Sequence, residues 1–189
     1  MSVFLDLIGS WVVRASLIAV MLTLTVNMNN ALYQSTQQVN AKALVSLVDS
    51  VIYADVNAAG YGAASPVTSN TFYSFSATNL SFYADLPGGA SPDLVTYTTV
   101  YNATTQLYKL SRQVNSGTTA LLGSDFSNIT FKYYDASGVE TAVAANIRQV
   151  RVMVDARYVL TNAFVETRGQ TVDTLYATSD FKVYPPNLL

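Results

Sequence analysis

The stretch VFLDLIGSWVVRASLIAVMLTLTV, residues 3–26, decides how this chain must fold. It is apolar at nearly every position, and Asp6 and Arg14 are the only charged residues among the first 41. As a helix this stretch is about 36 Å long, enough to cross the hydrocarbon core of a bilayer. The pattern predicts a helix that is apolar on all sides and that buries itself in lipid or in protein.

The helical sequence continues well beyond this stretch. No glycine or proline occurs between Gly9 and Gly60, so residues 10–59 form a run of 50 positions without a helix breaker. A continuous helix over this run would be about 75 Å long. The rest of the chain would form a globule with a radius of gyration near 14 Å, roughly enough to cover half of that helix. The other half must be covered by lipid or by copies of itself.

The second half of the helix is amphipathic, because its apolar and polar residues separate at helical spacing. We expect its apolar side to pack on the rest of the chain. This divides the chain into an N-terminal helix (residues 1–59) and a β-rich head (60–189). Within the helix, residues 3–26 are the membrane or filament-core segment and 27–59 pack on the head. The apolar set is Leu44, Leu47, Val48, Val51 and Ile52; the polar set is Lys42, Ser46, Asp49, Ser50 and Tyr53.

From about residue 71 the pattern of apolar residues alternates, which is typical of strands. The clearest example is IRQVRVMVDARY, residues 147–158, and Gly-containing turn signals at 87–89, 116–117 and 136–138 separate the runs. No second long helix remains to make parallel crossovers, so we predict an α+β fold with an antiparallel sheet or sandwich. The expected strands cover residues 71–76, 79–85, 94–101, 106–114, 118–122, 127–135, 146–158 and 172–184.

Composition excludes several classes of function. Charged residues make up 12% of the chain and the net charge is −2, which leaves no cationic surplus to bind nucleic acid. Histidine and cysteine are absent, which removes thiolate chemistry, His-based catalysis and nearly all zinc and iron sites. The acidic residues of the head are scattered. We therefore expect neither enzymatic activity nor a cofactor nor a metal.

Several short segments resemble one family. The helix is followed by DVNAAGY (55–61), and the head contains FYADL (82–86), QLYKL (106–110), ITFKYYD (129–135) and IRQVRV (147–152). In this order, behind a long apolar helix, they resemble type IV pilins and their relatives, the minor pilins and secretion pseudopilins. The resemblance implies a structural subunit of an extracellular pilus-like filament. It also implies an inner-membrane-anchored precursor, pilus-type export and assembly machinery, and helices that bundle inside a wall of heads.

The resemblance also gives Asp6 a role. If Met1 is removed, Asp6 becomes the fifth residue, where pilins usually carry a glutamate. Asp6 and Arg14 lie about 12 Å apart along one helix, so a neighbouring helix shifted by that distance would pair them between subunits. A shift of about 7 Å would instead bring Asp6 to the neighbour's N-terminal amine. In the alternative interpretation Asp6 lies among headgroups and Arg14 snorkels. The small residues expected at the helix contact are Gly9, Ser10, Ala15, Ser16 and Ala19.

Two other functions remain open. The protein could be a minor pilin or secretion pseudopilin, in a tip or a short piston. It could also be a membrane-anchored module whose head binds glycans or surfaces, with the many tyrosines as a stacking surface. A filament subunit predicts a helical homo-oligomer, whereas the anchored module predicts a monomer.

Weaker candidate sites lie in the head. Three sequons place possible glycosylation at Asn79, Asn102 and Asn128. Around Gly138, the side chains of Asp135, Ser137 and Glu140 could bind calcium through oxygen, although a plain β-turn is the favoured interpretation because the EF-hand spacing is missing.

Overall fold

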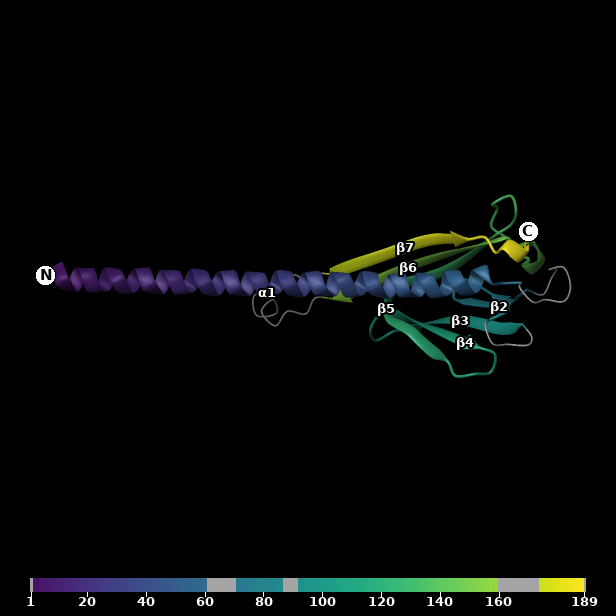
Figure 1. Cartoon of the computed structure of the whole chain (residues 1–189), viewed down its shortest axis with the longest axis horizontal. Helices are drawn as coiled ribbons and strands as arrows, with labels where there is room; N and C mark the ends of the chain where they lie inside the picture. The colour runs from purple at the N-terminus through teal and green to yellow at the C-terminus, as the bar shows by residue number, and fades with distance from the viewer. Residues whose placement is uncertain (1, 61–70, 87–91, 160–173, 189) are drawn as a thin grey trace.

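The computed structural model describes residues 2–60, 71–86, 92–159 and 174–188. One long helix, α1 (Ser2–Asn57), precedes seven strands that form a single antiparallel sheet (Figure 1). The α+β fold and its antiparallel sheet are confirmed. Of the two arrangements expected for the strands, the structure has one curled sheet instead of a two-sheet sandwich.

The sheet is a meander in which strands that follow one another in sequence are also neighbours in space. Every pairing is antiparallel, as expected for short connections without crossover helices. The strands are β1 (Phe72–Phe75), β2 (Asn79–Ala84), β3 (Asp93–Asn102), β4 (Leu107–Val114), β5 (Ala120–Tyr134), β6 (Gln149–Val159) and β7 (Thr174–Val183), with 3-10 turns η1 (Ala144–Asn146) and η2 (Pro186–Leu188).

The sequence pattern predicted two strands where the structure has β5 alone. The interruption expected at residues 123–126 is a bulged part of one strand, since the β4–β5 register shifts on both sides of Leu110. Gly123 explains the continuity. A Cβ atom there would lie 2.6 Å from the Phe126 ring and 3.2 Å from Leu44, so the missing side chain lets Phe126 and the helix pack closely. The glycine signals close packing here, and not a turn.

One face of the sheet curls around the second half of α1 (Figure 1). The helix residues that enter the core follow a spacing of three or four, as helix-to-sheet packing requires. Two residues correct the expected division of the helix. Leu47 is 54% exposed instead of buried, and Asp49 is half-buried beside β7 instead of facing solvent. The fully buried apolar set of this half is Ala41, Val45, Val48, Ile52 and Val56.

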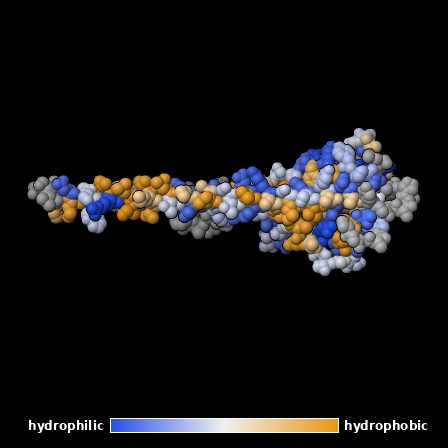
Figure 2. All heavy atoms as spheres, in the orientation of Figure 1, coloured by the Kyte–Doolittle hydropathy of each residue, from blue (hydrophilic) through white to orange (hydrophobic). Residues whose placement is uncertain are grey.

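The part of α1 before Ala41 projects away from the head as a rod, which we call the stalk (residues 2–40). Burial against the described part of the head therefore begins at Ala41, and not at residue 27 as expected. Figure 1 shows the sheet beginning alongside the later turns of α1, with the N-terminus at the opposite end of the molecule. Apolar side chains gather along the projecting part in Figure 2. The globule thus covers only part of the helix, as the length comparison predicts.

Candidate assembly surface

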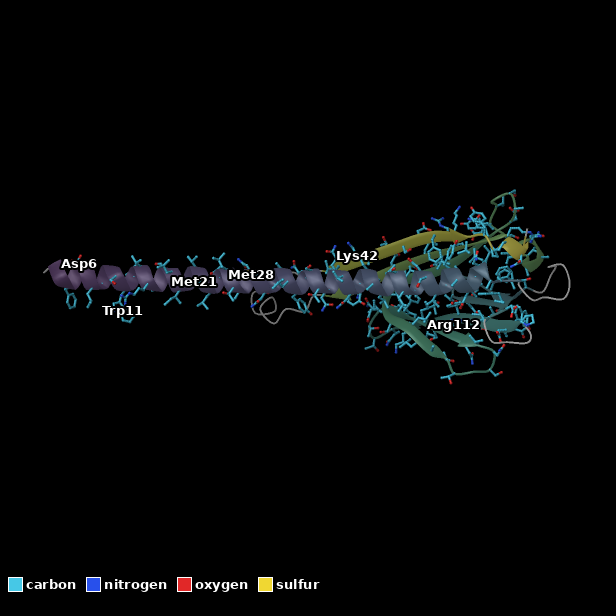
Figure 3. The ribbon with its side chains drawn as sticks, in the orientation of Figure 1. Asp6, Trp11, Met21, Met28, Lys42 and Arg112 are labelled. Atoms are coloured by element: carbon cyan, nitrogen blue, oxygen red, sulfur yellow. The ribbon has the colours of Figure 1, made fainter. Side chains whose placement is uncertain are left out.

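The stalk exposes apolar side chains around its whole circumference. All residues from 6 to 25 are exposed, and Trp11 and Met21 show 70% and 67% of their surface. Figure 3 shows Asp6, Trp11, Met21 and Met28 along this rod, well away from the head. Among the described residues, α1 is the one helix long and apolar enough to cross a membrane. Such a surface is stable in water only when lipid or protein covers it.

Four hydroxyl groups of the stalk, those of Ser16, Thr23, Thr25 and Thr36, are satisfied within the helix. Ser16 donates to the Val12 carbonyl at 2.8 Å, and Thr23 and Thr25 donate to the carbonyls four residues earlier at 2.9 Å. These bonds remove the need for a polar partner outside the helix. The stalk can therefore enter an apolar environment without leaving these donors unpaired.

The charged side chains of the stalk are different. Asp6 and Arg14 are both exposed, and neither forms a salt bridge with any residue that the structure describes. They are separated by about 12 Å along the axis and by about 80° around it. Ser10 lies between them in the same row, so two opposite charges flank a small residue on one side of the rod. One helix cannot pair them, but two helices can.

The other small residues form a second surface. On a regular helix Gly9, Ala15, Ser16 and Ala19 fall within an arc of about 120° that is separate from the charged row. No atom lies within 4 Å of the position that a Gly9 Cβ would occupy. The arc is thus open, and its small side chains permit another helix to approach closely. Ser10, the fifth predicted contact residue, belongs to the charged row instead.

The stalk is fixed to the head through a buried ion cluster at the end of α1. The Asp55 carboxylate accepts hydrogen bonds from Arg112 Nε at 2.6 Å, Arg112 Nη2 at 3.1 Å and the Tyr97 hydroxyl at 2.5 Å. Burial, and then the nearby carboxylate, raise the pKa of Tyr97, so the phenol stays protonated and donates. The hydrogen bond to Asp55 likewise raises the pKa of Arg112. Figure 3 shows Arg112 in the head, below the helix.

The sequence contains a signal for this cluster, although the partners could not be read from it. An acidic residue in the last turn of a helix faces the negative end of the helix dipole, so a buried Asp55 needs a cation. Arg112 lies 57 residues further along the chain, and only the sheet brings the two together.

The chain leaves the helix through a fixed turn. Gly60 adopts a φ of 79°, a left-handed conformation that favours glycine, and its N–H donates to the Tyr83 carbonyl at 2.9 Å. Asn187 Nδ2 donates to the Ala59 carbonyl at 3.3 Å. The helix end is therefore held by β2 and by the C-terminal segment together, which makes the stalk a rigid extension of the head.

A groove of about 390 Å³ lies between α1 and β7. Lys42, Ser46 and Asp49 line it from the helix, and residues 176–179 line it from the strand. Burial raises the pKa of Asp49, and a hydrogen bond from Ser179 offsets part of that rise. Asp49 Oδ1 is buried and accepts no hydrogen bond from the described part of the chain. The ionised carboxylate is thus poorly supported at this position.

We expect Asp49→Asn to raise the melting temperature at pH 7. A carboxyl whose folded-state pKa is raised binds its proton more tightly in the folded chain. The wild type consequently loses stability as pH rises from about 3.8 through the folded pKa, and the loss is complete above it. Thermal unfolding from pH 3 to 8 should show a gap between variant and wild type that closes at the acid end. A gap that widens toward low pH would contradict this account.

The weaker sites of the head lie in turns and strands. Asn102 is the last residue of β3, at the edge of the β3–β4 turn, and its Oδ1 accepts from the Thr104 N–H at 2.9 Å. Asn79 lies at the start of β2, and Asn128 donates to Asp155 at 3.2 Å from within β5. All three side chains are half-buried, so only the position of Asn102 beside a turn favours it among the three predicted glycosylation sites.

Around Gly138 the structure shows a hydrogen-bonded turn. Asp135 Oδ1 accepts from the Ser137 hydroxyl and from the N–H groups of Ser137 and Val139, all within 2.9 Å. Glu140 instead pairs with Lys132 at 3.4 Å. Within the described residues no group of three His, Cys, Asp or Glu side chains is placed to hold a metal ion.

No protein-family model, no curated protein and no solved structure matches this chain.

Proposed function

We propose that this protein is the structural subunit of an extracellular pilus-like filament, which polymerises through its stalk. The observation that supports this most is the exposure of residues 6–25 on every side of a rod that its own head cannot cover. The segments that resemble type IV pilins and their relatives support the same function. In this proposal the stalk anchors each subunit in the inner membrane until pilus-type machinery moves it into the growing filament.

Assembly exchanges one apolar environment for another. Because lipid tails are as apolar as a helix bundle, dehydration of the stalk cannot drive the exchange. Close packing along Gly9, Ala15, Ser16 and Ala19 would contribute, and so would pairing of the two charged residues. An unpaired ionised side chain costs about 2.5–3.5 kcal/mol at a bilayer centre on insertion scales, so a partner in the next subunit favours the filament over the membrane pool.

The ion cluster at the end of α1 supports a role in which force passes between the head and the stalk. A filament under tension pulls the head against its stalk, and the contact must not rotate or slip. Asp55 accepts hydrogen bonds from side chains on both β3 and β4, while Asn187 donates to the carbonyl of Ala59, four residues further along the chain. A membrane-anchored monomer needs no such rigid joint, so this observation favours the filament over the anchored module.

Electron microscopy of material sheared from cells that express the full chain tests the proposal. We expect helical filaments in which this protein, identified by mass, is the main component. A trace amount in filaments made mostly of another subunit would indicate the minor pilin or pseudopilin alternative. A chain that stays monomeric in the membrane fraction would contradict a polymerising subunit and leave the anchored module.

A further inference from the structure

A pocket of about 450 Å³ opens in the head at the end opposite the stalk. It is lined by the turn after β5, by the first residues of β6 and by Tyr184, which follows β7. Figure 1 shows the β5–β6 connection beside the C-terminus, at the far end of the molecule from the N-terminus. The pocket belongs to no part of the assembly surface, so what it binds is separate from how the chain polymerises.

The floor of the pocket carries a polar group without a partner. Gln149 is 4% exposed, yet its Nε2 donates no hydrogen bond to any residue in the described ranges. A buried amide that donates no hydrogen bond destabilises the fold. Gln149 lines the pocket, but its Nε2 is closed to solvent, so a ligand can accept this N–H only when the lining shifts slightly as the ligand binds.

Two charged groups of opposite sign also line the pocket, and both are held in place. Three hydrogen bonds from the turn fix the Asp135 carboxylate through its Oδ1. Arg148 Nη1 donates to the carbonyls of Ala145 at 2.8 Å and Ile147 at 2.9 Å, which fixes the guanidinium plane. Asp135 and Arg148 form no salt bridge with one another in the described structure. The other guanidinium nitrogens of Arg148 can thus donate to one ligand, and Oδ2 of Asp135 can accept from it.

An aromatic ring completes the lining. Tyr184 is 58% exposed although it lies beside a pocket, and the two prolines that follow it restrict its backbone. An exposed ring next to planar hydrogen-bonding groups can cover the apolar C–H face of a sugar while those groups bond its hydroxyls. The opposite charges balance, which favours a neutral polyhydroxylated ligand over a purely anionic one.

From these four groups we infer that the pocket formed by Asp135, Arg148, Gln149 and Tyr184 is a binding site for a neutral saccharide. Tyr184 stacks on the ring face, Gln149 and Arg148 donate to ring hydroxyls, and Asp135 accepts from one. The pocket has room for one or two sugar residues. Its position opposite the stalk leaves it available whether or not the stalks are bundled.

Saturation-transfer difference NMR on the full chain tests this site. The chain is held in an amine-oxide detergent, because a glycosidic detergent would compete for the pocket. The probes are methyl mannoside, methyl galactoside, N-acetylglucosamine and cellobiose, with inorganic phosphate as an anion control. We expect transfer to the ring protons of at least one sugar. No transfer to any sugar, or phosphate-induced shifts in the absence of sugar binding, would overturn the inference.

Two variants locate the binding in this pocket. Tyr184→Ala should weaken the affinity for the bound sugar about tenfold through lost stacking. Gln149→Leu should weaken it about fivefold without lowering the melting temperature, since it removes a buried donor that the folded chain leaves unpaired. The control is Tyr53→Ala, which removes a ring of similar exposure, 52%, from the helix. Affinity that falls equally in the control, or in none of the variants, would place the sugar elsewhere and contradict the inference.

Discussion

Arg112→Ala should lower the free energy of unfolding of the head by about 3–5 kcal/mol, because it leaves the Asp55 carboxylate buried without a cation. The Asp55 side chain is 9% exposed and the Arg112 side chain 24%, so water replaces little of the lost interaction. The total free energy of unfolding of a domain of this size is about 5–15 kcal/mol. Near-UV circular dichroism during urea unfolding, in detergent, should report this loss, since the head contains most of the tyrosines.

The head offers a matched control for this substitution. Arg151 also forms a bidentate pair, with Asp180, but the two side chains are 32% and 49% exposed. Arg151→Ala should cost far less than Arg112→Ala, because exposed pairs contribute little to stability. Equal losses in the two variants would show that burial of the Asp55 cluster contributes nothing beyond an ordinary surface pair.

A double substitution separates charge from packing. If the cost arises from the unpaired carboxylate, Asp55→Leu combined with Arg112→Met should recover most of the stability, because apolar residues of similar volume can replace a buried ion pair. A double variant as unstable as Arg112→Ala would instead assign the loss to the shape of the site. Tyr97→Phe is made in both backgrounds, because the buried Tyr97 hydroxyl loses its acceptor when Asp55 is replaced.

The sequence determined the outline of this fold because its strongest signals are long. The run from residue 10 to 59 without a breaker predicts α1, and period-two alternation in residues 147–158 predicts β6. Shorter signals failed where tertiary contacts decide. The pattern separates two strands at residues 123–126, yet Gly123 lies inside β5, where Phe126 and Leu44 occupy the space beside it. Leu47 fits the apolar spacing but lies outside the curl of the sheet.

The candidate sites divide in the same way. The stalk residues are consecutive in sequence, so their placement follows from helix geometry alone. The saccharide pocket could not be predicted, because Asp135, Gln149 and Tyr184 come together only through the order of β5, β6 and β7. The pairing of Arg112 with Asp55 could not be predicted for the same reason. The turn signals at residues 87–89 lie outside the described residues.

The largest effect on function is expected at the two charges of the stalk. Asp6→Arg alone should abolish filaments, because it places two like charges against one another at every contact between subunits. At about 3 kcal/mol for each mispaired contact, the concentration needed to add a subunit rises about a hundredfold. Arg14→Asp should have the same effect for the same reason. Filaments are counted by electron microscopy, and near-UV circular dichroism verifies that the head remains folded.

The double variant Asp6→Arg with Arg14→Asp decides which partner Asp6 has. If Asp6 of one subunit pairs with Arg14 of the next at a shift of about 12 Å, exchanging both charges restores the pair and the filaments. If Asp6 instead meets the neighbour's N-terminal amine, the exchange cannot rescue assembly, and Arg14→Asp alone leaves filaments intact. Lys109→Asp is the control for Arg14→Asp, because both replace a cation by an anion, and Lys109 is an exposed residue of β4.

The exchange is informative because the helix separates the two charges in a way that a single chain cannot relieve. Their offset of about 12 Å and 80° means that only a second helix, displaced along the first, places opposite charges side by side. Buried polar pairs specify register more than they add stability, so a rescued filament should also keep the wild-type axial rise. Normal filaments from Asp6→Arg alone would show that the charges lie among headgroups or solvent, and would remove them from the assembly surface.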